Sequence, residues 1–211
     1  MSEVRCFMLR DLPFERLWLR RYADGPCPLI PASEYSYHHA MTLWRERAPA
    51  EKKPHPVHGY LTIQTLEKAP AHEDTRWPTR CACGFEFPPE TVHQLFPRQI
   101  WATDDNREMT LEDAPVGAMW NMWWFADRRD YKGPGSFVGP DGLSLSVKTP
   151  GGEWYIDGPS YSEDRERMTG GWTRSGTPPD ITVTPSIRCM GDKGEPDRYH
   201  GWLRAGVLVP C

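Results

Sequence analysis

The four residues Cys81-Ala82-Cys83-Gly84 constrain the fold of this chain more than any other stretch. In an extended segment, side chains alternate between two faces, so Cys81 and Cys83 point the same way. The glycine that follows permits the tight turn that a pair of metal-binding thiols needs. Two thiolates on one side of a turn suit a soft divalent ion, most readily zinc. The alternative is that both cysteines are small residues buried in a core.

The other cysteines and histidines determine which residues could complete such a site. The chain has 6 cysteines among 211 residues, and they are Cys6, Cys27, Cys81, Cys83, Cys189 and Cys211. No secretory signal follows Met1, so we expect a reducing compartment, in which clustered thiols are metal ligands. The predicted ligands of a tetrahedral Cys3His zinc site are Cys81, Cys83, Cys189 and His200. Cys211 is the alternative fourth ligand.

The number of protein ligands decides what a zinc ion could do here. Four ligands close the site and make it structural, whereas three leave a position for water. Zinc would lower the pKa of that water to roughly 7, and a nearby carboxylate would act as general base. Asp157 is the candidate catalytic residue, with Glu153 and Asp180 as further carboxylates. The alternative for Asp157 is a turn residue, because Gly158-Pro159 follows it.

Charge and motif content exclude several function classes. The net charge of -4 gives no basic surface of the kind that binds nucleic acid. The most apolar run, residues 118–126, is too short to cross a bilayer, so we expect no membrane partner and a cytoplasmic location. No H-E-x-x-H, G-x-S-x-G or phosphate-binding glycine motif occurs. The expected partner is therefore a protein or a peptide substrate.

The distribution of proline, glycine and alternating apolar residues predicts the fold class. The 22 prolines and 18 glycines favour turns and short strands. Strands are expected at 59–66, 143–149, 154–156, 181–183, 202–203 and 207–209, with hairpin turns at Gly151-Gly152 and within 203–208. Helices are expected at 32–47 and 89–96. Trp120, Trp123 and Trp124 have helical spacing and would form core or, alternatively, a binding groove.

These elements predict an α+β fold that is mainly β, with short antiparallel strands and hairpins around a zinc-ribbon-like Cys/His site. Residues 1–74 are expected to form an N-terminal extension of mixed strand and helix. Residues 75–211 are expected to form the mainly-β zinc-binding domain.

Several motifs resemble those of a group of uncharacterised tailed-phage proteins. They are Trp77-Pro78-Thr79, Gly117-Ala118-Met119-Trp120, Gly139-Pro140-Asp141-Gly142, Thr149-Pro150-Gly151-Gly152, Trp154-Tyr155-Ile156-Asp157 and Tyr199-His200-Gly201-Trp202-Leu203-Arg204. The resemblance covers roughly residues 75 to 209. It implies a bacteriophage protein but no particular activity.

A more distant resemblance is to a bacterial family of unknown-function domains found beside genes for ubiquitin-like conjugation. The shared features are the C-x-C-G corner at 81–84, Pro185-Ser186-Ile187, Cys189 and His200. This resemblance implies a zinc peptidase, a hydrolase that acts on ubiquitin-like tails. The chain departs from the family pattern because an insertion separates Cys83 from the C-terminal strands.

Three functions therefore remain open. The first is a zinc-dependent hydrolase, which needs an open metal position. The second is a non-catalytic phage accessory protein with a structural zinc, acting in the host cytoplasm on a protein partner. The third is a virion component, such as a minor capsid or decoration protein.

Overall fold

The chain forms two compact units, which we describe separately. Unit 1 comprises residues 1–11, 52–63 and 101–211, and unit 2 comprises residues 12–51 and 64–100. The computed structural model describes residues 2–29, 37–48, 52–55, 59–62, 68–125, 137–158, 160–161, 168–169, 171–191 and 196–211. All regular elements in these ranges are strands, so the mainly-β prediction is confirmed and the α+β class is wrong. The described residues contain no helix that could span a membrane.

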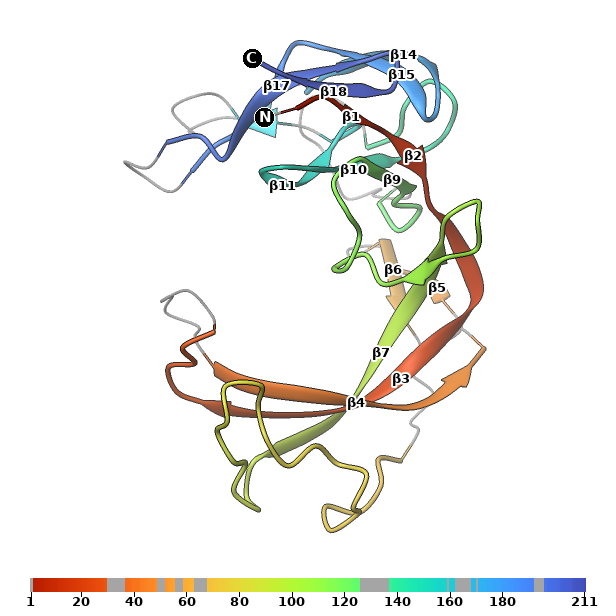
Figure 1. Cartoon of the computed structure of the whole chain (residues 1–211). Helices are drawn as coiled ribbons and strands as arrows, with labels where there is room; N and C mark the ends of the chain where they lie inside the picture. Colours follow the sequence, from red (N-terminus) through yellow and green to blue (C-terminus); the bar gives the residue numbers. More distant parts are fainter. Residues whose placement is uncertain are drawn as a thin grey trace. The chain divides into compact units, whose positions relative to one another are not determined.

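A long hairpin forms the centre of unit 2. It belongs to a sheet with the order β4-β3-β7-β8, whose strands are β3 (Arg10–Asp24), β4 (Tyr37–Arg47), β7 (Val92–Ala102) and β8 (Glu108–Met109). Figure 1 shows β3 and β4 running side by side, with the segment at about residues 68–91 along one side of them. Burial alternates along β3, where Leu17 and Leu19 are buried and Arg16 and Trp18 are partly exposed. One face of the sheet is therefore covered and the other is not.

Arg21 attaches the covering segment to β3. Its guanidinium donates hydrogen bonds to the carbonyl oxygens of Pro88 at 2.8 Å and Pro78 at 3.3 Å. The same group lies 5.6 Å from the centroid of the Phe87 ring. Burial lowers the pKa of Arg21, but these carbonyl bonds replace the water that the charge has lost.

Unit 1 contains two four-stranded sheets and several two-stranded ribbons. The first sheet has the order β1-β18-β17-β16 and the second has the order β11-β10-β9-β2. The strands of the first are β1 (Val4–Arg5), β18 (Val207–Pro210), β17 (Tyr199–Arg204) and β16 (Ile187–Cys189). Those of the second are β11 (Gly152–Tyr155), β10 (Leu145–Thr149), β9 (Ala118–Asn121) and β2 (Phe7–Met8).

The two-stranded ribbons complete the described strands. They pair β5 (Lys52–His55) with β6 (Gly59–Thr62), β12 (Ser160–Tyr161) with β13 (Met168–Thr169), and β14 (Thr173–Thr177) with β15 (Asp180–Thr184). Among the described registers, β2 with β9 is the parallel pair and the others are antiparallel. The sheets of unit 1 enclose a core of fully buried residues that includes Leu145, Ile181 and Leu203.

The two expected helices are wrong where the structure describes them. Residues 37–47 form β4 and residues 92–102 form β7, while the part of the first helix at 32–36 lies outside the described residues. β4 pairs with β3 along its whole length, and this ladder satisfies backbone groups that a short isolated helix would leave marginal. The expected strands near 145–149 and 207–210 are confirmed, as is the hairpin at Ala205-Gly206. In that hairpin both turn residues have positive φ, 43° and 75°.

The tryptophan-rich stretch is a strand followed by a turn. Trp120 lies on β9 with 0% of its surface exposed, so its assignment to the core is confirmed and its assignment to a helix is wrong. Trp124 packs against the same apolar cluster from the turn. The division expected between residues 74 and 75 falls inside unit 2, because the segment at 68–91 lies on the β3–β4 hairpin.

A buried ion pair holds part of unit 1 together. Arg174 on β14 donates from Nε to Asp157 at 2.7 Å and from Nη1 to Asp141 at 2.9 Å. The Arg174 and Asp157 side chains are only 2% and 6% exposed. Asp157 also accepts the backbone N–H of Leu145 at 2.8 Å. The carboxylate of Asp157 therefore has satisfied hydrogen bonds in a buried site, which is typical of a structural ion pair.

We expect Asp157→Asn to lower the free energy of unfolding by about 3 kcal/mol, because it removes the more deeply buried of the two carboxylates that neutralise Arg174. Urea unfolding monitored by tryptophan fluorescence measures the change. The control is Asp180→Asn, which breaks an exposed pair with Arg5 and should change stability by less than about 1 kcal/mol. Equal stability of Asp157→Asn and the native chain would contradict the structural role.

Candidate metal centre

Four side chains of unit 2 converge in one group that could hold a metal ion. They are Cys27, His38, Cys81 and Cys83, and their ligand atoms all lie within 4.8 Å of one another. Cys27, His38 and Cys81 are buried, with 3%, 7% and 5% of their surfaces exposed, and Cys83 is partly buried. The set is Cys3His, which is a donor set of structural zinc sites.

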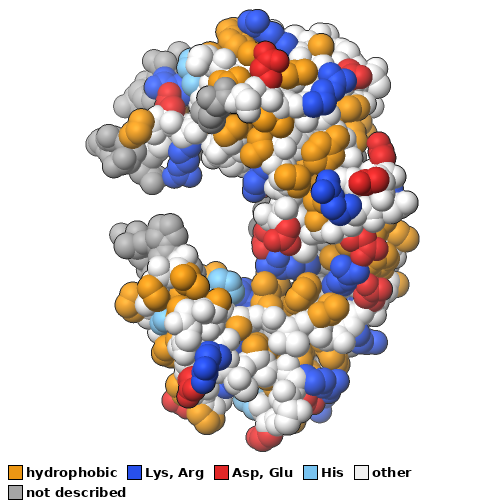
Figure 2. Space-filling view, in the orientation of Figure 1, with side chains coloured by type: hydrophobic (Ala, Val, Ile, Leu, Met, Phe, Trp, Pro, Cys, Tyr) orange, Lys and Arg blue, Asp and Glu red, His pale blue; other side chains and the backbone are white. Residues whose placement is uncertain are grey.

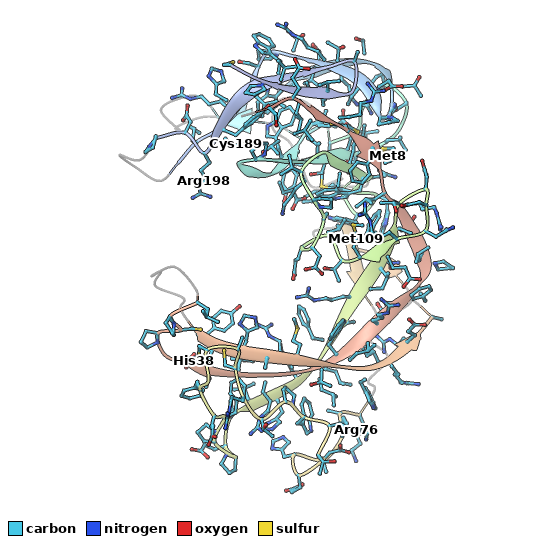
Figure 3. All side chains as sticks on the ribbon, viewed as in Figure 1. Met8, His38, Arg76, Met109, Cys189 and Arg198 are labelled. Carbon is cyan, nitrogen blue, oxygen red and sulfur yellow. The ribbon has the colours of Figure 1, made fainter. Side chains whose placement is uncertain are left out.

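The β3–β4 hairpin supplies the first two ligands. Ala23 on β3 lies directly opposite His38 on β4, so His38 points to the same face as Arg21 and Ala23. Figure 3 labels His38 near the beginning of β4. Cys27 follows the end of β3 after Gly25, whose φ of +136° turns the chain. The hairpin thus directs Cys27 and His38 towards the covered face of the sheet.

A tight turn supplies the other two ligands. Gly84 donates its N–H to the carbonyl of Cys81 at 2.9 Å, and Cys81 donates to the carbonyl of Phe85 at 2.8 Å. Gly84 has a φ of +96°, which favours glycine. Further out, Phe87 donates to Thr79 at 3.0 Å. The tight turn expected at Gly84 is therefore present, and we call residues 79–87, with Cys81 and Cys83 at the tip, the knuckle.

Aromatic packing fixes the His38 ring. The ring is stacked on Phe85 with centroids 4.0 Å apart and planes at 6°. Its Nδ1 lies 3.2 Å from Sγ of Cys83. Phe85 in turn meets Phe87 edge to face. The ring is therefore oriented towards the cysteines before any ion binds, which reduces the entropy lost on binding.

The sulfur separations fit a zinc ion better than a disulfide. Sγ of Cys27 and Sγ of Cys81 are 4.0 Å apart, and all six cysteines have free thiols. Zn–S bonds of about 2.3 Å in a tetrahedron place two sulfurs about 3.8 Å apart. A disulfide needs about 2.05 Å. The group is thus consistent with a zinc-binding site.

The protein environment already favours a thiolate at Cys81. Burial raises the pKa of this thiol, but hydrogen bonds from the backbone of Cys83 and His39 and from the His38 side chain outweigh burial and lower the pKa to about 6. The pKa of Cys83 is raised: a backbone hydrogen bond from Phe85 lowers it, but burial and the neighbouring sulfurs of Cys81 and Cys27 outweigh that bond. Several thiolates at close range repel one another, and a divalent cation removes this repulsion.

The remaining residues of the expected ligand set lie in unit 1. On β16 and β17, Cys189 is opposite Tyr199 and Arg188 is opposite His200. Cys189 and His200 therefore point to opposite faces of their sheet, and the structure does not bring them together. Cys189 lies 3.4 Å from the Thr149 hydroxyl; in Figure 3 it is labelled close to Arg198.

His200 and Cys211, the other expected ligands, lie on β17 and directly after β18. His200 Nε2 lies 3.1 Å from the Ser186 hydroxyl on an exposed surface. Cys211 is exposed and donates its N–H to the carbonyl of His200. Ligation of the ion at Cys81 by Cys189, His200 or Cys211 would join the two units, and it stays a prediction. The catalytic role expected of Asp157 also stays a prediction, although its carboxylate is engaged by Arg174.

Sequence reasoning missed Cys27 and His38. Cys27 lies between two prolines in a segment typical of a loop, and His38 and His39 are adjacent, so their side chains face different directions. If these residues form a strand, two adjacent histidines point to opposite faces of the sheet, so one of them must lie on the covered face and could be a ligand. His38 is on that face, and His39 contacts Tyr37 on the other. The helix expected at 32–47 concealed the alternation.

We expect Cys27→Ser, His38→Gln, Cys81→Ser and Cys83→Ser each to lose most of the bound zinc and to destabilise unit 2, because binding energy of a structural zinc, about 10 kcal/mol or more, is also folding energy. Metal content by mass spectrometry and thermal unfolding measure both effects. His39→Gln is the matched control, since it alters the neighbouring imidazole on the opposite face. Zinc loss in Cys189→Ser but not in Cys27→Ser would instead support the ligand set that joins the units.

We also expect the metal-free protein to show an ultraviolet absorbance of the Cys81 thiolate that disappears as the pH falls through about 6. The folded-state pKa lies below the usual 9.0, so the thiolate stabilises the fold fully above about pH 9, and this contribution is lost as the pH falls to about 6. An ultraviolet pH titration measures the transition. Cys81→Ser should abolish it, and the absence of a thiolate transition near pH 6 in the native chain would contradict the hydrogen-bonded thiolate.

Comparisons with protein-family models, with curated proteins and with solved structures found no match to this chain. Its function is therefore argued from its own side chains. Among the described residues, the feature that bears most directly on function is the convergence of Cys27, His38, Cys81 and Cys83 in unit 2.

Proposed function

We propose that this protein is a zinc-binding protein whose metal is structural and whose role is to bind another protein without catalysis. The observation that supports the proposal is the group of Cys27, His38, Cys81 and Cys83, which offers four soft ligands within 4.8 Å of one another. Three thiolates and one imidazole match the tetrahedral preference of zinc and leave no position for water.

The location of the group supports a structural role. Cys27 and Cys81 are 54 residues apart in sequence, so one ion would connect the β3–β4 hairpin to the knuckle at 79–87. The apolar cluster between them has only Cys27, Cys81 and Phe87 as fully buried members. A core this small contributes little apolar burial, and small folded regions commonly compensate with a metal.

A zinc hydrolase is the alternative function, and the group favours it less. Hydrolysis needs an open coordination position and a carboxylate near the metal-bound water. The group of four contains no carboxylate, and Asp157 is engaged in its buried pair with Arg174. A peptidase of ubiquitin-like tails would therefore require one ligand to leave the metal.

The biological setting of this binding role rests on the resemblance to tailed-phage proteins. We propose an accessory protein that acts in the host cytoplasm, with a virion component as the alternative. Detection of the protein in purified particles would support the virion component. Its absence from particles and presence in infected-cell extract would support the accessory role.

X-ray absorption at the zinc edge tests the proposed function. We expect one zinc per chain, with three sulfur ligands and one nitrogen ligand, in protein purified without chelators or metal-affinity resin. His38→Gln should replace the nitrogen with oxygen or remove the metal, whereas His39→Gln should leave the spectrum unchanged.

Two results would overturn this proposal. An oxygen ligand in the native chain would make hydrolysis the leading function and justify a screen of peptide substrates. Protein without zinc, after addition of zinc to the metal-free chain, would remove the metal site itself.

A further inference from the structure

The face of the β4-β3-β7 sheet that points away from the metal group carries an arginine among aromatic rings. In the β3–β4 register, Arg20 lies opposite Met41 and Tyr22 lies opposite His39, whereas Ala23 lies opposite His38. Because side chains alternate, Arg20 and Tyr22 share the face that the segment at 68–91 does not cover. Figure 2 shows hydrophobic side chains beside histidine and basic side chains on the surface of unit 2.

Three rings surround the Arg20 guanidinium. Its central carbon lies 5.3 Å from the centroid of Tyr22, 5.6 Å from that of Tyr37 and 5.0 Å from that of Phe96. Its Nη2 donates to the Tyr37 hydroxyl at 3.2 Å, and Tyr22 and Tyr37 meet edge to face. We call Arg20, Tyr22, Tyr37 and Phe96 the Arg20 cradle. The rings hold the guanidinium plane in one place and exclude part of its water.

The charge of Arg20 is not neutralised within the described part of the chain. Arg16, on the same strand and face, pairs with Glu46 at 2.8 Å, and Arg47 pairs with Glu15 at 2.6 Å. Arg20, in contrast, donates a hydrogen bond to the neutral Tyr37 hydroxyl. A guanidinium has five N–H donors in a planar fork, so most of them remain for a ligand. The hairpin thus supplies carboxylates for Arg16 and Arg47 but leaves Arg20 with unused donors.

We propose that the Arg20 cradle binds a carboxylate side chain of an acidic protein segment. The inference rests on the proposed binding role and identifies its site and the chemistry of its partner. A carboxylate fits the guanidinium fork with two parallel hydrogen bonds, which are stronger where rings exclude water. Arg98, whose guanidinium lies 4.9 Å from the Phe96 ring, adds a second positive charge beside the cradle.

The composition of this face favours a protein segment over a nucleic acid. The rings of Tyr22, Tyr37 and Phe96 already face the guanidinium, whereas single-stranded nucleic acid requires ring faces on which bases stack. Met41 and Leu43, which is 47% exposed, flank the cradle with apolar surface. Aromatic residues, methionine and arginine are the types enriched at protein interfaces.

Binding of a short labelled peptide of Glu-Leu-Ser repeats to the zinc-loaded full chain tests the proposal, with fluorescence anisotropy as the readout. The comparison probes are Gln-Leu-Ser and Lys-Leu-Ser peptides and an oligothymidylate. We expect saturable binding of the acidic peptide at concentrations below about 1 mM, and weakening of this binding as salt is raised. The two other peptides and the oligothymidylate should not bind.

Substitutions of Arg20 distinguish the hydrogen-bonding geometry of the guanidinium from its positive charge. Arg20→Gln should weaken binding of the acidic peptide by about 10- to 100-fold. Arg20→Lys keeps the charge without the planar fork and should weaken it by about tenfold. Tyr37→Phe removes the hydroxyl that orients the fork and should have a smaller effect in the same direction. Arg204→Lys is the matched control, because Arg204 also lies over an aromatic ring, 4.6 Å from Trp202 in unit 1.

Specific results would overturn the proposal. Equal binding of the acidic peptide by Arg20→Gln and the native chain would remove the cradle as the site. Binding of oligothymidylate in preference to the peptide would replace the protein partner with a nucleic acid, and no binding of any probe would also contradict the proposal. Zinc content is measured in every variant: zinc lost from the native chain would refute the proposed function, whereas full zinc content with no peptide binding would refute the cradle alone.

Discussion

The contact between the tip of the knuckle at 79–87 and the open end of the β3–β4 hairpin holds unit 2 together. At this place Cys27 and His38 meet Cys81 and Cys83, and the described apolar cluster around them has Cys27, Cys81 and Phe87 as its buried members. The neighbouring attachment is polar: Arg21 bonds to two carbonyl oxygens of the covering segment. Neither interaction is a large hydrophobic surface. These directional bonds add to the burial of Trp77, which is 3% exposed, and a metal that joined the four ligands would be the strongest of them.

The strict alternation of β3 gives the two faces of its sheet different roles. The odd-numbered residues from Leu17 to Ala23 face the covering segment and the thiols. The even-numbered residues Arg16, Trp18 and Arg20 lie on the other face. A single strand thereby helps to form a metal site on one side and presents an aromatic and basic surface on the other. Any change of register by one residue would exchange the two faces and abolish both. A metal bound to His38 would stabilise the register on which the Arg20 cradle also depends.

Local features of the sequence predicted more of this molecule than distant ones. The knuckle could be predicted because Cys81, Cys83 and Gly84 are adjacent and their geometry depends on a single turn. The complete set of four candidate ligands could not be predicted, because Cys27 and His38 reach the knuckle only through the register of β3 with β4. Residues 37–47 also have good helix-forming composition, and only the β3 ladder makes them a strand. The prediction of Cys189 and His200 as zinc ligands depended on their residue types and their place in the chain. Their pairing with Tyr199 and Arg188 on opposite faces was not visible in the sequence.

The first and last strands of the chain are neighbours, with Val4 opposite Leu208 and Arg5 opposite Val207. This pairing has a consequence for the order in which the protein matures on the ribosome. β1 emerges long before its partner β18, so the sheet that contains them stays incomplete until β18 has been synthesised. All four thiol and imidazole ligands emerge by residue 83, well before that point. The hairpin and turn that carry these four side chains can therefore form before β18 is made, whereas β1 waits for β18 to complete its sheet.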